Sequence, residues 1–217
     1  MRSAALCVLV GAAVVSGCKK SPPDALASVG NAVLDYASPP REVQYERRRV
    51  VGQLGVPTQP IRETWTRLDA VDKGAQYRVS VGVVGEPQDR VANLLSYTDA
   101  GLLISGEGTY AKDGELVFGT WAPPKTLLPP APAVGMSWDG QHSLGDLSEY
   151  RSCEIMSSKQ CDGDGLVVVC DVKRTEFRVV TRDHFCRDVG WSGYESLVVR
   201  QGHPDVRTWT EGVRRVD

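Results

Sequence analysis

Residues 75–83 read AQYRVSVGV, and their alternation predicts a β-strand with one buried face. One side of this strand would carry Ala75, Tyr77, Val79, Val81 and Val83. Successive side chains of a strand point to opposite faces, so an apolar residue at every second position is typical of a half-buried strand. The same period of two recurs along much of the chain, whereas helical spacing is scarce after Pro40.

Turn signals separate these strand-like runs. Asp113-Gly114 predicts a two-residue hairpin turn of the primed type, because Gly adopts a positive φ easily, and this turn sets Lys112 opposite Glu115. The run GLVVVCDV is apolar on both faces and is expected in the centre of a sheet. Strands are predicted in the C-terminal half at 149–155, 165–172, 176–185, 193–200 and 205–211.

The predicted fold class is mainly β with little helix. Antiparallel strands would form a curved sheet, or a sandwich or half-barrel of two β-rich halves, at about 41–121 and 134–217. Long helices never alternate with the strands, which disfavours a parallel α/β fold. The Pro-rich stretch between the halves (Pro123, Pro124, Pro129, Pro130, Pro132) cannot lie in a central strand and is predicted to be an extended crossover.

Composition sets the general class. The 217 residues are 41% hydrophobic and 24% charged, which suits one globular domain or two small ones. The net charge of −2 gives no basic excess, so a nucleic-acid partner is not expected.

The N-terminus predicts export. Arg2 precedes an apolar run at 4–15 that is too short to cross a bilayer of about 30 Å as a helix. Val15-Ser16-Gly17-Cys18 resembles the lipobox of bacterial lipoproteins. This resemblance implies that a signal peptide, residues 1–17, is removed and that Cys18 carries acyl chains such as palmitate. The alternative is an ordinary cleaved signal with a chance cysteine.

The lipobox resemblance also implies an address. Residues 18–40 would form a lipidated tether before a β domain at 41–217, although 21–40 could instead pack as the first element of the domain. Lys19 stands where an Asp tends to retain such proteins in the inner membrane, so the outer membrane is expected. The protein would face the periplasm or the cell surface, with the membrane as partner through the acyl chains on Cys18, and with a possible envelope protein partner.

A second resemblance covers most of residues 36–200. The stretches 96–103 (SYTDAGLL), 128–138 (LPPAPAVGMSW) and 186–191 (CRDVGW) look like an LPxPxxVGxxW motif and a GVG turn found in uncharacterised bacterial secreted and lipoprotein domains. The resemblance implies an antiparallel β fold and no established activity.

Four cysteines remain in the expected exported domain, where disulfides are the default. A hairpin centred near 161–162 would place Cys153 opposite Cys170, and a next turn near 173–174 would place Cys186 beside Cys161. The sequential pairing, 153–161 with 170–186, stays open. A Cys₄ zinc site is disfavoured because no CxxC is present.

The remaining candidate sites are weak. Asp162-Gly163-Asp164-Gly165 lacks the later ligands of a calcium loop and is interpreted as a polar turn. A triad of Ser192, His184 and an Asp would need to assemble in space, since no G-x-S-x-G surrounds the serine. Five tryptophans could line a groove for a lipid or sugar, or pack in the core; they are Trp65, Trp121, Trp138, Trp191 and Trp209.

The sequence therefore predicts a lipid-anchored envelope protein without catalytic residues, metal or cofactor, acting as an interaction or structural module. The alternatives are a binding protein for a hydrophobic or glycan ligand and an envelope hydrolase.

Overall fold

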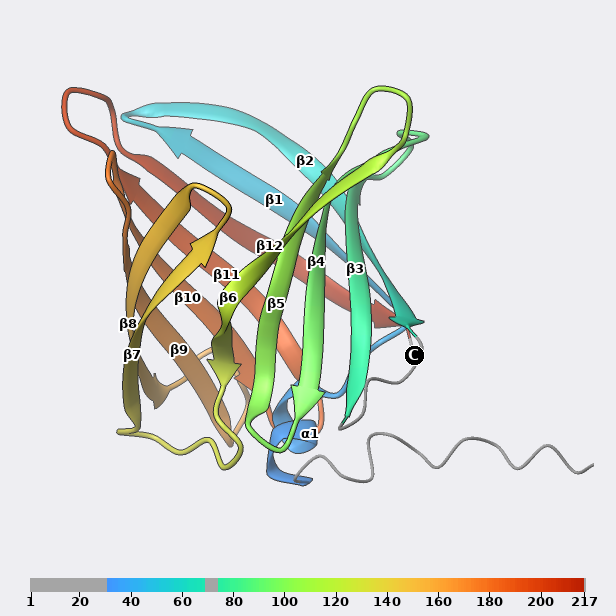
Figure 1. Cartoon of the computed structure of the whole chain (residues 1–217), viewed down its shortest axis with the longest axis vertical. Coiled ribbons are helices and arrows are strands. Elements are labelled where there is room, and N and C mark those ends of the chain that lie inside the picture. The colour runs from blue at the N-terminus through green and yellow to red at the C-terminus, as the bar shows by residue number, and fades with distance from the viewer. Residues whose placement is uncertain (1–30, 69–73, 217) are drawn as a thin grey trace, which may run out of the picture.

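The computed structural model describes residues 31–68 and 74–216, which form an antiparallel β-barrel of twelve strands with one short helix (Figure 1). The predicted mainly β, antiparallel fold is confirmed. The sheet is more regular than a curved sheet or half-barrel, because β1 pairs with β12 and closes it. Cys18, the signal at 1–17 and the tether up to residue 30 lie outside the described residues.

Every strand pairs with the next one along the chain, so the barrel is an up-and-down meander. The elements are α1 (Asn31–Ala37), β1 (Glu42–Val51), β2 (Leu54–Leu68), β3 (Ala75–Val83), β4 (Asp89–Thr98), β5 (Gly101–Tyr110), β6 (Leu116–Leu128), β7 (Ser137–Leu144), β8 (Leu147–Ser157), β9 (Gly165–Lys173), β10 (Arg178–Cys186), β11 (Gly190–Val199) and β12 (Val206–Val216). In the described part of the chain, no helix is long and apolar enough to cross a membrane.

The alternation predicted for 75–83 sorts side chains between the inside and the outside of the barrel. Ala75, Tyr77 and Val79 are buried in the core, and Val81 lines the interior cavity. The outer face carries ion pairs between neighbouring strands, such as Arg48–Glu211 at 2.6 Å and Arg178–Asp171 at 2.7 Å.

Helix α1 packs against one end of the barrel (Figure 1). Its Val33, Tyr36 and Ala37 are at most 4% exposed and belong to the same core as Leu102 and Phe185 of the strands. The helix is held by the turn after β10, where the Asp188 backbone N–H donates to the Asp35 carbonyl at 2.7 Å. Residues 31–40 thus pack as part of the barrel.

The last turn of α1 is fixed to β4 by a buried hydrogen bond. The Tyr97 hydroxyl, on a side chain with no exposed surface, donates to the Ala37 carbonyl at 2.6 Å. Burial raises the pKa of Tyr97, so the phenol stays a donor at any ordinary pH.

We expect Tyr97→Phe to lower the free energy of unfolding by about 1–2 kcal/mol, because it leaves the buried Ala37 carbonyl without its donor. Urea denaturation measures the change. Tyr150→Phe is the matched control, since Tyr150 is 38% exposed on the outer face, and it should be neutral. Equal stabilities for the two variants would contradict this role of the Tyr97 hydroxyl.

The Pro-rich stretch differs from the predicted crossover. Pro123 and Pro124 lie within β6, opposite a register shift between Ile104 and Gly106 of β5. On its other side β6 forms only one residue pair with β7, Ala122 with Ser143. Proline cannot donate a ladder hydrogen bond, which explains the irregular pairing on both sides. Only residues 129–136 form a true connection between the halves.

Side chains supply hydrogen bonds where the β6–β7 ladder is missing. The Ser143 hydroxyl donates to the Ala122 carbonyl at 3.0 Å. The His142 Nδ1 lies 3.0 Å from the Pro123 carbonyl, and because a carbonyl can only accept, this nitrogen carries the proton. The weakest strand pair of the barrel is therefore bridged by two residues of β7.

The predicted hairpin at Asp113-Gly114 exists but has a three-residue turn. Tyr110 faces Leu116 and Ala111 bonds Glu115, so Lys112 is not opposite Glu115. Gly114 takes a φ of +86°, as the last residue of such loops requires, and the sequence rule for two-residue loops was wrong by one position.

The disulfides are Cys153–Cys170 and Cys161–Cys186, the pairing that the hairpin argument favoured. The first joins directly opposed residues of β8 and β9, with Cα atoms 4.1 Å apart. The second ties the loop between β8 and β9 to the end of β10. The turn between β9 and β10 spans 174–177, later than predicted, so Cys186 faces Gly165 and reaches Cys161 across the loop.

Candidate ligand-binding site

The interior of the barrel contains a cavity of about 440 Å³. A barrel of eight strands is just filled by its own side chains, and the diameter grows with strand number. The twelve strands here leave more space, of which α1 fills one end. A volume of several hundred Å³ is in the range of small-molecule sites.

Apolar and aromatic side chains form much of the cavity wall. Val79, Leu95 and Ile104 come from consecutive strands, and Val179 and Phe185 come from the opposite side of the barrel. Two pairs of aromatic rings extend this surface. The rings of Trp65 and Tyr77 lie 6.1 Å apart, and those of Tyr45 and Trp191 lie 5.6 Å apart.

Two carboxyl groups with raised pKa values face the cavity. The Tyr45 hydroxyl donates to Glu63 Oε1 at 2.8 Å, and the Trp191 indole N–H donates to Asp183 Oδ1 at 3.2 Å. Burial raises the pKa of Glu63 to about 7, against the lowering effect of the bond from Tyr45, and the charge of Asp183 adds to the rise. Burial raises the pKa of Asp183 to about 6, against the bond from Trp191 and the charge of Arg151.

A charged cluster occupies the part of the cavity away from α1. β10 runs from the 174–177 turn to the 187–189 turn that contacts α1, so Arg174 marks the opposite end of the barrel. Arg174 donates from Nε and Nη2 to Glu149 Oε2 at 2.9 and 2.7 Å. Lys125 Nζ lies 2.6 Å from Glu107 Oε1 and 3.3 Å from Glu149 Oε1, and 3.7 Å above the Trp121 ring.

The electrostatics of this cluster depend on Glu149, whose side chain is 2% exposed. Burial raises its pKa, but the charges of Lys125, Arg174 and Arg151 together lower it below the ordinary value. Burial lowers the pKa of Lys125, and Glu107 and Glu149 offset part of that change. The carboxylate is therefore ionised and fully engaged by two cations.

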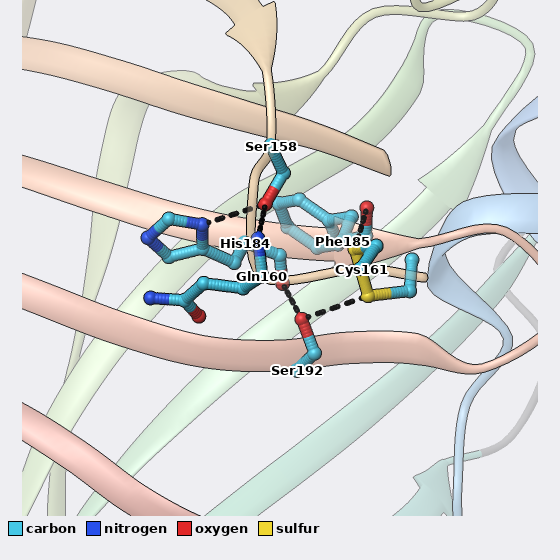
Figure 2. The surroundings of a disulfide bond; sticks show 7 residues. Ser158, Gln160, Cys161, His184, Phe185 and Ser192 are labelled. Atoms are coloured by element: carbon cyan, nitrogen blue, oxygen red, sulfur yellow. Dashed lines mark hydrogen bonds between the residues drawn. A yellow bond between two sulfur atoms is a disulfide. The ribbon is translucent and has the colours of Figure 1, made fainter. Parts of the chain in front are cut away.

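The serine and histidine considered for a hydrolase do not meet. The Ser192 hydroxyl donates to the His184 carbonyl at 3.2 Å and lies 3.3 Å from Cys186 Sγ, whereas the imidazole faces Ser158 (Figure 2). The Ser158 hydroxyl accepts from the Gln160 backbone N–H at 3.2 Å and is hydrogen-bonded to His184 Nδ1 at 3.0 Å.

The surroundings of His184 are those of a buried structural residue. Burial lowers the pKa of His184, which is 6% exposed and thus neutral, and Ser158 is 5% exposed beneath the loop that the Cys161–Cys186 disulfide holds. Glu195 Oε1 lies 3.9 Å from His184 Nε2, beyond hydrogen-bond distance. His184 and Ser158 are therefore buried, whereas a hydrolase needs its histidine within reach of a substrate.

The tryptophans and the Asp-Gly-Asp-Gly turn that the sequence suggested as sites lie in different parts of the molecule. Trp65 and Trp191 line the cavity, Trp121 is buried beside Lys125, Trp138 packs against the core, and Trp209 bonds Glu211 on the outer face. Asp164 of the Asp-Gly-Asp-Gly turn pairs with Arg187 at 2.9 Å. Within residues 31–68 and 74–216, no group of three or more His, Cys, Asp or Glu side chains could hold a metal ion.

Sequence reasoning missed the polar lining of the cavity. Glu63, Lys125, Glu149, Arg151 and Asp183 all lie on inward positions. A signal existed for one strand: in β8, Glu149 and Arg151 share a face with Cys153 and Ile155. Charged residues in register with buried ones predict a polar interior.

No protein-family model, curated protein or solved structure matches this chain. The resemblances noted in the sequence therefore stay predictions.

The two raised pKa values predict a pH-dependent stability. In the unfolded chain Glu63 and Asp183 titrate near 4.5 and 3.8, so between about pH 4 and pH 7 the folded protein keeps protons that the unfolded chain has released. The free energy of unfolding must fall as the pH rises through this window. We expect the Glu63→Gln/Asp183→Asn variant to flatten that fall, with its largest gain in stability over the parent at pH 8 and almost none near pH 4.

Urea denaturation at intervals from pH 4 to pH 8 measures the effect. Glu154→Gln, at an exposed carboxylate on the outer face of β8, is the matched control and should follow the parent profile. Parallel profiles for the double variant and the parent would show that these carboxyl groups titrate normally.

Proposed function

We propose that this protein is a binding protein for a small hydrophobic or amphipathic ligand, held inside the barrel. The observation that carries the proposal is the cavity of about 440 Å³, with apolar and aromatic walls and a few fixed polar groups. Such a combination is typical of small-molecule sites, in which the apolar walls supply affinity and the polar groups fix orientation.

The structure favours this function over the others that the sequence left open. A purely structural module has no need of a hollow interior with buried charged groups, because such groups are costly to bury. Buried charged groups are therefore expected mainly at functional sites. A glycan site uses exposed aromatic faces with many hydrogen-bonding groups, whereas Trp65 and Trp191 point into a largely apolar space. A hydrolase is disfavoured by the separation of Ser192 from the His184 ring.

The cell envelope is the proposed location. A β-barrel with two disulfides fits an envelope protein, since disulfides persist in oxidising compartments. Anchoring through acyl chains on Cys18, in the outer membrane, is supported by the lipobox resemblance alone. In that arrangement the barrel would hold a hydrophobic ligand close to the bilayer from which such ligands come.

Ligand binding is tested with N-phenyl-1-naphthylamine, a neutral apolar probe that fluoresces when it leaves water. We expect the protein to bind it, and we expect Thr181→Phe to weaken binding about tenfold or more, because Thr181 lines the cavity and a ring there overfills it. Val180→Phe is the matched control, since the neighbouring side chain points to the other face of β10. No fluorescence increase with the parent protein, or equal binding by Thr181→Phe, would reject the proposed function.

The anchor is tested separately. In a bacterial host that processes lipoproteins, we expect a fatty-acid label to enter the parent protein and to be absent from Cys18→Ser, whose hydroxyl cannot replace the thiol as acceptor. Electrophoresis and fluorography measure incorporation, with Ser16→Ala as a control that keeps a small residue. Label retained by Cys18→Ser would refute the lipoprotein assignment without affecting the cavity.

A further inference from the structure

Arg151 is not explained by a merely apolar site. It projects from β8 into the cavity, between Glu149 and Cys153 along the strand, and it is 7% exposed. Its Nη2 donates to Cys170 Sγ at 3.4 Å, and its Nε has no hydrogen-bond partner. Among residues 31–68 and 74–216, no carboxylate lies within 4.0 Å of its guanidinium group.

The carboxylates around the cavity are engaged elsewhere. Glu149 forms an ion pair with Lys125 through one oxygen and accepts from Arg174 on the other, and Glu107 accepts from Lys125. The cluster of three cations (Lys125, Arg151, Arg174) and two carboxylates (Glu107, Glu149) therefore has one positive charge in excess. Elsewhere on the cavity wall, the raised pKa values of Glu63 and Asp183 reduce the negative charge that they can offer Arg151 below about pH 6.

A buried guanidinium without a carboxylate partner is costly, because Arg151 has lost water and its Nη2 has gained only a weak bond to a sulfur atom. Its planar fork presents parallel N–H groups that match a carboxylate or a phosphate, and such charge-assisted bonds are among the strongest in proteins. A cation left in this state, facing an empty space with apolar walls, is complementary to an anion that carries an apolar chain.

We propose that Arg151 binds the anionic group, a carboxylate or a phosphate, of a ligand with a single apolar chain. The proposal deepens the proposed function and rests on it. The anionic group would lie beside Arg151, near the charged cluster, and the chain would extend among Leu95, Ile104 and Phe185 toward the end that α1 closes.

The test is competition against N-phenyl-1-naphthylamine at pH 6 with four ligands of equal chain length: decanol, decanoate, decyl phosphate and decyltrimethylammonium. We expect decanoate or decyl phosphate to bind about 10- to 100-fold more tightly than decanol, the gain from hydrogen bonds to a charged group. Decyltrimethylammonium should bind most weakly. Whichever anion binds more tightly identifies the headgroup as a carboxylic acid or a phosphate ester.

Arg151→Met should abolish the preference for the anions over decanol, and Arg151→Lys, which keeps the charge but not the planar fork, should retain part of it. Arg178→Met is the matched control, because Arg178 pairs with Asp171 on the outer face, and it should keep the full preference. Without ligand, the unfolding midpoint of Arg151→Met should equal or exceed that of the parent, since an unpaired buried charge is removed.

The outcomes separate the two proposals. If decanol displaces the probe but the anions bind no more tightly, the barrel binds apolar ligands and the role of Arg151 is rejected. If Arg151→Met unfolds at a lower midpoint and keeps the preference for anions, Arg151 is a structural residue. If the probe itself does not bind, the proposed function fails first.

Discussion

The pairing of β1 with β12 is the constraint on which the other features depend. It turns a meander into a closed barrel, so every second side chain of every strand must lie in a confined space. An open sheet could turn Glu63, Arg151 or Asp183 toward water by curving away, but a closed one cannot. Polar residues at inward positions must then pair with each other, stay neutral by keeping a proton, or pair with a bound ligand. The cavity contains examples of the first two, and Arg151 is the proposed example of the third.

The two ends of the closed barrel differ in the residues that fill the interior. At one end α1 supplies Val33 and Tyr36 to a continuous apolar core, and the Tyr97 bond to Ala37 fixes it there. At the other end no such element fills the interior in the described part of the chain, and Glu149 instead organises Lys125 and Arg174. The interior thus carries its ion-paired cluster at the end away from α1, whereas the carboxyl groups nearer to α1, Glu63 and Asp183, have raised pKa values. A ligand with one apolar and one anionic end matches this distribution better than one of uniform polarity.

Local patterns in the sequence predicted much of the sheet, but they did not predict the long-range strand pairing that closes it. The alternation of 75–83 and the symmetric hairpin around 161–162 involve neighbours in the sequence, so one rule of periodicity fixes which residues are buried and that Cys153 faces Cys170. The closing strand pair joins Val43 to Arg215, which lie far apart in the chain, and no local sequence pattern of either strand indicates which strand it pairs with. The turn at 174–177 was misplaced because no Gly or Pro punctuates it. The inward charges were missed because charge is normally a sign of the outer face.

The polar groups of the cavity lower the stability of the fold. Glu63 and Asp183 keep their protons at a cost in stability that grows up to about pH 7, and Arg151 has lost its water without gaining a counter-ion. A sequence selected for stability alone would replace these groups with apolar ones, which is often neutral or favourable for buried charges. Two disulfides, each of which stabilises by about 2–4 kcal/mol, offset such losses. Because the disulfides lie in β8, β9, β10 and the loop between them, they reinforce the wall from which Arg151 projects, and that wall holds the guanidinium in place for its ligand.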